Sequence, residues 1–314
     1  MTQIFCDFER LSTNLNAKHT SLGNMVLHVY FVINYAEKHG MTPVIKSGVN
    51  ISNLFFFKDS VIQEDGDSFK FECAFDEIDP IKKPSILRRI LTKLTGKFLI
   101  NQSLLDLHSG DHDSFLASQR FLNDSNFDHN QKYIRGHFWH YELMPSLKKV
   151  SKYLDINDTI KRKILSKYDL INKKNSVAVH FRGGDYRLPI DGLHIYKEGI
   201  ILSENYYQLA IKEVYKKIKN PIFHLFSDEI QTLEAYFKGH NYIVHNGNSY
   251  EDWTAISMCH NSIQSNSSFS WTASLFTPGL LIQPQNGLAF NYSCGSYPYG
   301  FKHNRAISIL NTTQ

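Results

Sequence analysis

The second half of the chain alternates between short apolar runs and longer stretches in which apolar residues recur at helical spacing. Apolar runs of this length are typical of buried strands, and they occupy 177–181, 222–226, 242–245, 262–264 and 280–283. The helical patterns between them cover 203–218, 229–238, 250–260 and 268–276. Because strands that alternate with helices build parallel sheets, this half predicts a doubly wound α/β lobe.

The first half gives one clear signal of the same kind. The apolar residues Met25, Val29, Val32 and Ala36 share one face of a predicted helix that ends at Gly40, and "TPVI" then predicts a strand. This order is typical of the opening of a β-α-β unit. Between residues 50 and 130 no period emerges, so the sequence does not predict the architecture there.

A lysine-rich stretch, residues 145–175, is predicted to be helical and to separate the two halves. We therefore expect an N-terminal lobe over residues 1–160 and a C-terminal lobe over residues 161–314. A chain of 314 residues, 42% of them apolar, is long enough for two such cores.

Charge and cysteine usage exclude several classes of protein. The 34 Lys and Arg against 30 Asp and Glu give a net charge of only +4, unlike the basic excess of a dedicated nucleic-acid binder, so we expect no nucleic acid as partner. The four cysteines lack C-x-x-C spacing, which argues against a zinc knuckle or a disulfide scaffold and favours free thiols in a reducing compartment.

The chain shows neither a secretion signal pattern nor an apolar run of membrane-spanning length, so a cytoplasmic location is expected. The segment 81–100 carries six cations and no acid among large aliphatic residues. We expect a surface helix there with its apolar stripe on the core. The alternative is peripheral contact with an anionic membrane, at its inner face, which a lipid-linked substrate would favour.

Polar clusters follow three predicted strands of the second half. Ligands bind beyond the carboxyl ends of the strands in open parallel sheets, so these clusters are expected to share one edge. They are His180, Arg182, Gly183, Gly184 and Asp185 after the first strand, Ser227 and Asp228 after the second, and 265–270 ("SNSSFS") after the fourth.

Together the clusters predict a nucleotide-diphosphate site. Arg182 offers a fork of donors to a diphosphate, and Gly183 and Gly184 let backbone amides approach the same anion. Asp228 is suited to accept hydrogen bonds from a base edge or ribose hydroxyls. The third cluster can cap a helix and donate to phosphate, through Asn266, Ser267, Ser268 and Ser270.

Other chemistries lack their characteristic residues. A group of histidines and aspartates has a spacing that could bind a metal. Surface histidines in a polar loop explain this group better, because no H-E-x-x-H motif is present, so no metal is expected. These residues are His108, Asp111, His112, Asp113, His137 and His140. No G-x-S-x-G elbow, phosphate loop of the Walker type or G-x-G-x-x-G motif occurs.

In order and spacing, "HFRGGDY", "FSD" and "SNSSFSW" resemble the α1,2-fucosyltransferases of glycosyltransferase family 11, which have His-x-Arg-Arg-Gly-Asp-Tyr, Phe-Ser-Asp and Ser-Asn-Ser-Ser-Phe-Ser-Trp-Trp. "LGNM" near the N-terminus, "YIRGHFWHYE" (133–142) and "NYYQLAI" (205–211) resemble three further segments of that family. The resemblance thus spans most of the chain and is densest from 176 to 276.

The resemblance implies an α/β fold of GT-B type, with two Rossmann-like lobes and a cleft between them. It implies an inverting transfer of fucose from GDP-fucose, with no obligatory metal, to a galactose-type acceptor in a surface glycan or lipopolysaccharide repeat. The acceptor would be an oligosaccharide or a lipid-linked glycan, as in O-antigen biosynthesis. The N-terminal lobe would mainly hold this acceptor, and the C-terminal lobe the donor.

The resemblance also implies roles for single residues. Arg182 would stabilise charge on the leaving diphosphate, and Asp185 and His180 would position the loop or accept the proton of the acceptor hydroxyl. Phe269 joins the donor-binding residues of the second and third clusters. Gly23 and Asn24, at the first turn of the N-terminal helix, would face the donor sugar.

Three departures from the family pattern leave alternatives open. Gly183 stands in place of the second arginine, Thr272 in place of the second tryptophan, and Ser21 and Met25 in place of Gly and Gln. Arg187 could restore the lost charge. The alternatives are another nucleotide-sugar donor on the same fold, or a glycan- or nucleotide-binding protein without turnover.

Overall fold

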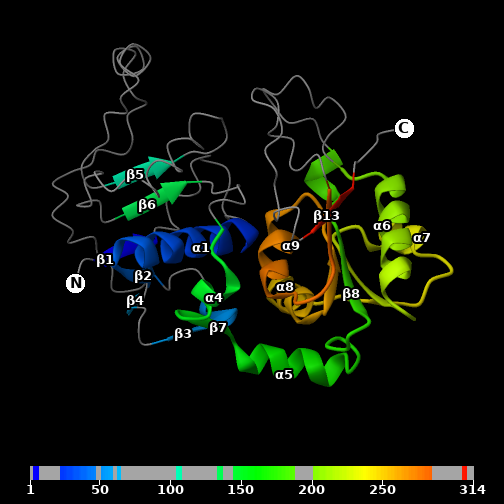
Figure 1. Cartoon of the computed structure of the whole chain (residues 1–314), viewed down its shortest axis with the longest axis horizontal. Helices are drawn as coiled ribbons and strands as arrows, with labels where there is room; N and C mark the ends of the chain where they lie inside the picture. The colour runs from blue at the N-terminus through cyan, green and yellow to red at the C-terminus, as the bar shows by residue number, and fades with distance from the viewer. Residues whose placement is uncertain are drawn as a thin grey trace, which may run out of the picture.

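Figure 1 shows the protein as a computed structural model, which describes residues 3–6, 22–46, 51–58, 62–64, 104–107, 133–136, 144–187, 201–284 and 306–309. The basic segment 81–100 and the six residues of the possible metal site lie outside these ranges, so the predictions made for them stay predictions. Within them, no helix is both long and apolar enough to cross a membrane.

The second half forms a six-stranded sheet in which every adjacent pair of strands is parallel, as the sequence predicted. Its order is β10-β9-β8-β11-β12-β13. The strands are β8 (Ser176–Phe181), β9 (Ile222–Ser227), β10 (Tyr242–Val244), β11 (Asn261–Ile263), β12 (Leu281–Pro284) and β13 (Ile307–Ile309). Five of them match the five predicted apolar runs, whereas β13 was not predicted.

Helices cover both faces of this sheet (Figure 1). On one face, Val177, Val179 and Phe181 pack with residues of α6 (Glu204–Lys217) and α7 (Ile230–Tyr236). On the other face, Ala178 and Phe226 belong to a core shared with α8 (Ser249–Met258) and α9 (Ser268–Ala273). Alternate residues of β8 therefore serve two different cores, which is why all six of its residues are buried and four of them are apolar.

The first half carries a second parallel sheet, of five strands in the order β4-β2-β1-β6-β5. These strands are β1 (Gln3–Cys6), β2 (Thr42–Lys46), β4 (Ile62–Glu64), β5 (Leu104–Leu107) and β6 (Tyr133–Gly136). Two parallel sheets with helices confirm the predicted α/β class with two Rossmann-like parts.

Helix α1 (Leu22–His39) lies between the first sheet and α9 (Figure 1). Fourteen of its eighteen residues are buried, because it is covered by the sheet on one side and by the second half on the other. Its side chains share one hydrophobic core with Trp253 of α8 and Ala273 of α9. The Tyr30 hydroxyl donates to the carbonyl of Thr272 over 3.2 Å within this core. The two halves are therefore packed directly against each other at α1.

The prediction of helix throughout residues 145–175 was wrong at β7 (Leu154–Ile156), which pairs antiparallel with β3 (Phe55–Phe57). Leu154 and Ile156 are buried while Asp155 is exposed, the period of two that a half-buried strand shows. Only the distant partner β3 makes this short run a strand. The short 3-10 turn η2 (Ile51–Asn53) precedes β3.

Two helices of the same stretch were predicted correctly, α4 (Leu147–Val150) and α5 (Asp158–Lys167). Asn157 caps α5 by accepting a hydrogen bond from the Thr159 amide at 2.9 Å. α5 then packs against α8 of the second half. The lobe boundary at residue 160 stays a prediction.

Candidate functional site

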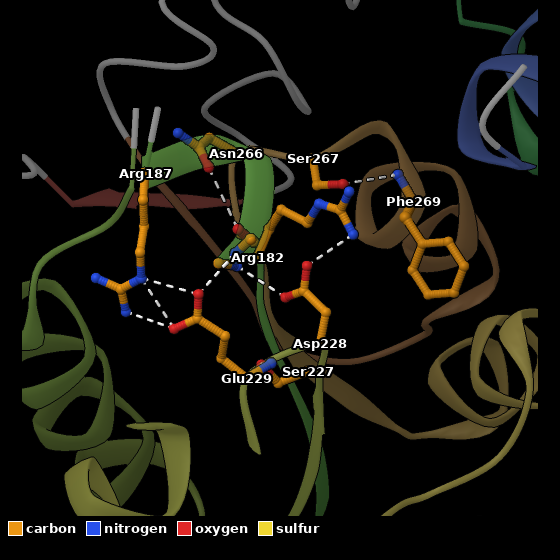
Figure 2. A network of polar contacts seen from close by, with 11 residues as sticks. Arg182, Arg187, Ser227, Asp228, Glu229, Asn266, Ser267 and Phe269 are labelled. Carbon is orange, nitrogen blue, oxygen red and sulfur yellow. Dashed lines mark hydrogen bonds and ion pairs between the residues drawn. The ribbon is translucent and has the colours of Figure 1, made fainter. Parts of the chain in front are cut away.

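Parallel pairing of β8 with β9 brings the first two polar clusters together. Phe181 lies opposite Ser227 in the register, so the residues that follow each strand are neighbours. The Asp228 carboxylate accepts a hydrogen bond from the Gly183 amide at 2.8 Å and pairs with the Arg182 guanidinium, with 2.8 Å between Oδ2 and NH1 (Figure 2). The carboxylate that was expected to bind a base or ribose thus orients the arginine in this structure.

A second carboxylate, that of Glu229, makes the same kind of contact one residue further along. It accepts the Gly184 amide at 2.7 Å and the Arg187 guanidinium through Nε at 2.8 Å and NH2 at 2.5 Å (Figure 2). Hydrogen bonds from Arg187, and then from the Gly184 amide, lower the pKa of Glu229 to about 2. No motif identified Glu229, and its only signal in the sequence was its place beside Asp228.

These contacts change the predicted use of the glycine amides. Both amides donate to carboxylates of the protein, and Gly184 adopts φ +47°, a conformation that glycine reaches without strain. Arg187 does not restore the charge lost at residue 183, because Glu229 neutralises it. Arg182 has a side chain 38% exposed, so solvent reaches the cation that was expected to meet a diphosphate.

His180, at the end of β8, is buried beside this arginine. Burial first, and the positive charge of Arg182 second, lower the pKa of His180 to about 3. Its ring lies 5.3 Å from that of Phe269 in α9, measured between centroids. The imidazole is therefore neutral at physiological pH and a weak base, so its predicted role in accepting a proton is unfavourable here and its role in positioning is the stronger one.

A row of polar side chains crosses the sheet at the level of His180. Ile263 lies opposite Val179 and Ile282, so the next residue of each segment, Gln264, His180 and Gln283, comes at the same level of the sheet. Gln283 lies opposite Ser308 on β13. Gln283 donates to the Ser308 hydroxyl at 3.1 Å, whereas Gln264 Nε2 and His180 Nδ1 are buried without a hydrogen-bond partner. Sequence reasoning missed Gln264, although it ends a predicted strand just before the third cluster.

The third cluster forms the first turn of α9, and its polar atoms are used within that turn. Ser267 caps the helix by accepting the Phe269 amide at 3.3 Å, and the Ser270 hydroxyl donates to the Ser267 carbonyl at 3.4 Å. Asn266 accepts from the Ser265 hydroxyl at 3.3 Å. All of the cluster's predicted ligand residues except Phe269 are more than nine-tenths buried, namely Asn266, Ser267, Ser268 and Ser270.

The N-terminal half reaches the site through the first turn of α1. A Cβ built on Gly23 would lie 2.4 Å from the Phe269 backbone nitrogen and 2.5 Å from Ser268 Oγ, so only glycine allows this approach. Asn24 follows it in α1 and is partly buried. The structure therefore brings Gly23, in the first turn of α1, against the third cluster. That Gly23 and Asn24 face the donor sugar stays a prediction. The structure places Asp185 in the 3-10 turn η5 (Gly184–Arg187), and the side chain of Asp185 lies outside what the structure describes.

The arrangement suits the binding of an anion whose charge grows during a reaction. Arg182 is held by Asp228 at one side and lies 5.6 Å from the Tyr186 ring, so its guanidinium is oriented before a ligand arrives. In the ranges that the structure describes, no group of three or more His, Cys, Asp or Glu side chains could hold a metal ion.

Comparison with known sequences gives two curated relatives from Escherichia coli. An α-1,2-colitosyltransferase is 33% identical over 125 residues, which cover 38% of this chain and 41% of the relative. The O-antigen biosynthesis glycosyltransferase WbnK is 30% identical over 125 residues, 37% of this chain and 40% of the relative. The matched stretch thus spans about two fifths of the length of these relatives.

Comparison with solved structures extends over most of the fold. The NodZ α-1,6-fucosyltransferase co-crystallised with GDP has a TM-score of 0.51 at 14% identity, covering 91% of this chain and 96% of its own. A mutant of Arabidopsis thaliana FUT1 in complex with GDP has a TM-score of 0.52 at 12% identity, covering 91% of this chain and 71% of its own. At such identities the likeness concerns the fold alone, which is the α/β fold of GT-B type that the sequence predicted.

The family profile described as glycosyl transferase family 11 matches residues 83–283, which is more than half of the chain. This range contains all three polar clusters, the Arg182–Asp228 ion pair and the first turn of α9. By this match, the chain belongs to glycosyl transferase family 11.

Proposed function

We propose that the protein is an inverting α1,2-fucosyltransferase that moves fucose from GDP-fucose to a galactose-type acceptor. The observation that carries the proposal is the Arg182–Asp228 pair at the end of β8, where a partly exposed guanidinium is held ready for an anion. Family membership supports glycosyl transfer as the reaction class.

In the proposed reaction, an acceptor hydroxyl forms a bond to the anomeric carbon while the bond from that carbon to the diphosphate breaks. Positive charge builds on the sugar ring and negative charge on the departing GDP. Arg182 binds the growing negative charge more tightly than the ground state, which lowers the barrier without requiring a metal. The hydroxyl proton passes to a carboxylate, and we assign this role to Asp185, because Asp185 lies in the turn η5 that follows Arg182, whereas His180 is buried.

For the acceptor, we propose a surface glycan or lipopolysaccharide repeat, oligosaccharide or lipid-linked. The O-antigen glycosyltransferase among the relatives supports this class. We propose that the reaction takes place in the cytoplasm and that the basic segment 81–100 contacts the anionic inner face of a membrane.

A second candidate keeps the site and changes the donor sugar. One relative is named an α-1,2-colitosyltransferase, and Gly183 removes a guanidinium that the family pattern has. A donor carrying colitose, or another nucleotide sugar, is therefore the alternative to GDP-fucose.

Calorimetric titration with GDP, GDP-fucose, GDP-mannose, UDP and UDP-galactose tests the proposal. We expect selective binding of GDP and GDP-fucose, and Arg182→Ala should weaken it by about 1.5–3 kcal/mol, the range for a hydrogen bond to a charged group. Arg162→Ala, which removes an exposed arginine on α5, is the matched control and should bind as the wild type does.

Each other outcome has a definite meaning. Preference for a UDP-sugar, or no binding of any of the five, contradicts the fucosyltransferase proposal. Binding of GDP without transfer to any galactose-containing acceptor, and without slow hydrolysis of GDP-fucose, identifies a binding protein instead.

A further inference from the structure

The space beside Gly183 is filled by the side chain of Glu229. A Cβ built on Gly183 would lie 2.3 Å from Glu229 Cδ and 2.4 Å from Glu229 Oε1. No side chain fits at residue 183 unless Glu229 moves away. In the family pattern residue 183 is the second arginine. In this chain it is a glycine, and the Glu229 carboxylate occupies the space beside it.

Glu229 fixes the turn that follows Arg182. Its carboxylate accepts the Gly184 amide at the start of this turn and the Arg187 guanidinium at the end of it (Figure 2). Its own amide donates to Ser227 Oγ at 2.8 Å, which fixes its backbone at the end of β9. The turn is therefore tied at both ends to a residue that lies just after the neighbouring strand β9, at the start of α7.

We infer that Glu229 is a positioning residue of the donor site, an inference that rests on the proposed function. It takes the place of a side chain at residue 183 and, through Gly184 and Arg187, sets the path of the loop from which Arg182 extends. Asp228 orients the guanidinium itself, and Glu229 orients the backbone that carries it.

The inference separates an effect on the site from an effect on stability. Glu229 is 27% and Arg187 47% exposed at the side chain, and surface ion pairs contribute little to global stability. Removing the pair should therefore leave the protein folded while the loop loses its fixed geometry. The chain offers a matched control in Glu213, whose side chain is 28% exposed and which pairs with Lys216 at 2.6 Å on α6.

The first experiment measures binding and catalysis in Glu229→Gln, with Glu213→Gln as the control. We expect the dissociation constant for GDP and the KM for GDP-fucose hydrolysis to rise about tenfold in Glu229→Gln, and the melting temperature to match that of the control. A merely structural role would lower the melting temperature and leave the KM of the remaining folded enzyme unchanged, which would overturn the inference.

The second experiment tests the shared space. Gly183→Ala should displace the Glu229 side chain, so it should weaken GDP binding about as much as Glu229→Ala does. Because either change breaks the contacts of the Glu229 carboxylate with Gly184 and Arg187, the double variant should bind GDP no more weakly than each single variant. Additive losses would show that residues 183 and 229 act independently, contrary to the inference.

A third measurement needs no ligand and separates the inference from the proposed function. Amide hydrogen exchange over residues 183–187 should speed up in Glu229→Ala and Gly183→Ala but not in Glu213→Ala. Unchanged exchange overturns the inference. If exchange speeds up while the wild type binds neither GDP nor GDP-fucose, the proposed function fails and the positioning of the turn stands.

Discussion

Gly23 of α1 packs against the backbone of Phe269 in α9 so closely that a Cβ on Gly23 would lie 2.4 Å from the Phe269 nitrogen. Two of the three atoms that a larger residue would meet, Phe269 N and Ser268 C, belong to the backbone, which cannot swing aside as the end of a side chain can. The first turns of two helices from opposite halves of the chain thus depend on this glycine.

We therefore predict that Gly23→Ala destabilises the protein by about 1–3 kcal/mol, the usual cost of overpacking. Urea unfolding measures it. Lys38→Ala, on an exposed position of the same helix, should change the free energy of unfolding by no more than about 0.5 kcal/mol. Equal stability of the two variants would contradict the close packing of α1 on α9.

Thr272 shows how the chain accommodates the loss of the family's second tryptophan. Its buried hydroxyl accepts the Trp253 indole N–H at 3.0 Å and donates to the Ser268 carbonyl at 2.8 Å. Thr272→Val keeps the shape and leaves the indole donor without a partner, so it should cost about 1–3 kcal/mol of unfolding free energy.

Thr272→Ser is the matched control for this prediction, because it keeps the hydroxyl and removes only a methyl group. Denaturant unfolding of both variants should show the smaller loss in the serine variant. The opposite order would mean that the methyl group matters more than the hydrogen bonds.

Acid should destabilise the protein through its buried histidines. His224 Nδ1 lies 2.9 Å from His245 Nε2. Burial lowers the pKa of His224 to about 4. Burial first, and then the charges of His224 and Lys167, lower the pKa of His245 to about 3. A histidine with a native pKa below its unfolded value of about 6.5 binds protons more readily when unfolded. This contribution is complete above pH 6.5 and is lost as the pH falls towards 4.

Burial has the opposite consequence for Asp252, because it raises the pKa of this carboxyl to about 6 and so favours the folded state as the pH falls through 6. The buried histidines outnumber it, so the free energy of unfolding should decrease from pH 7 to pH 5. Urea titrations at both pH values measure the change. His224→Gln should reduce the slope by up to about 1.4 kcal/mol per pH unit, and an unchanged slope would contradict the assignment.

Asp228→Asn should separate turnover from stability. The Arg182–Asp228 pair is exposed at both side chains, so its loss should cost no more than about 1 kcal/mol of stability. Turnover should fall about tenfold or more, because the guanidinium loses the carboxylate that orients it. Steady-state kinetics on the donor and thermal unfolding test both parts of this prediction. A variant that keeps the full turnover would show that Asp228 does not position Arg182.

Most of the second half could be predicted from the sequence, because each buried strand is a short apolar run and each helix keeps a period of 3.6. The edge of the sheet where His180, Arg182 and Asp228 meet could also be predicted, since parallel strands place their carboxyl ends together. The strand β7 could not, because three residues become a strand only through a partner about a hundred residues away.

The sequence by itself therefore determined the fold class, the family pattern and the polar edge of the second sheet. Tertiary structure decided which groups contact each other there. It placed Glu229 in the space beside Gly183, gave both glycine amides to carboxylates, and set Gly23 against Phe269. The physical reason is that periodicity reports which face of an element is buried, whereas partners across strands and halves depend on register and on the close approach of backbones.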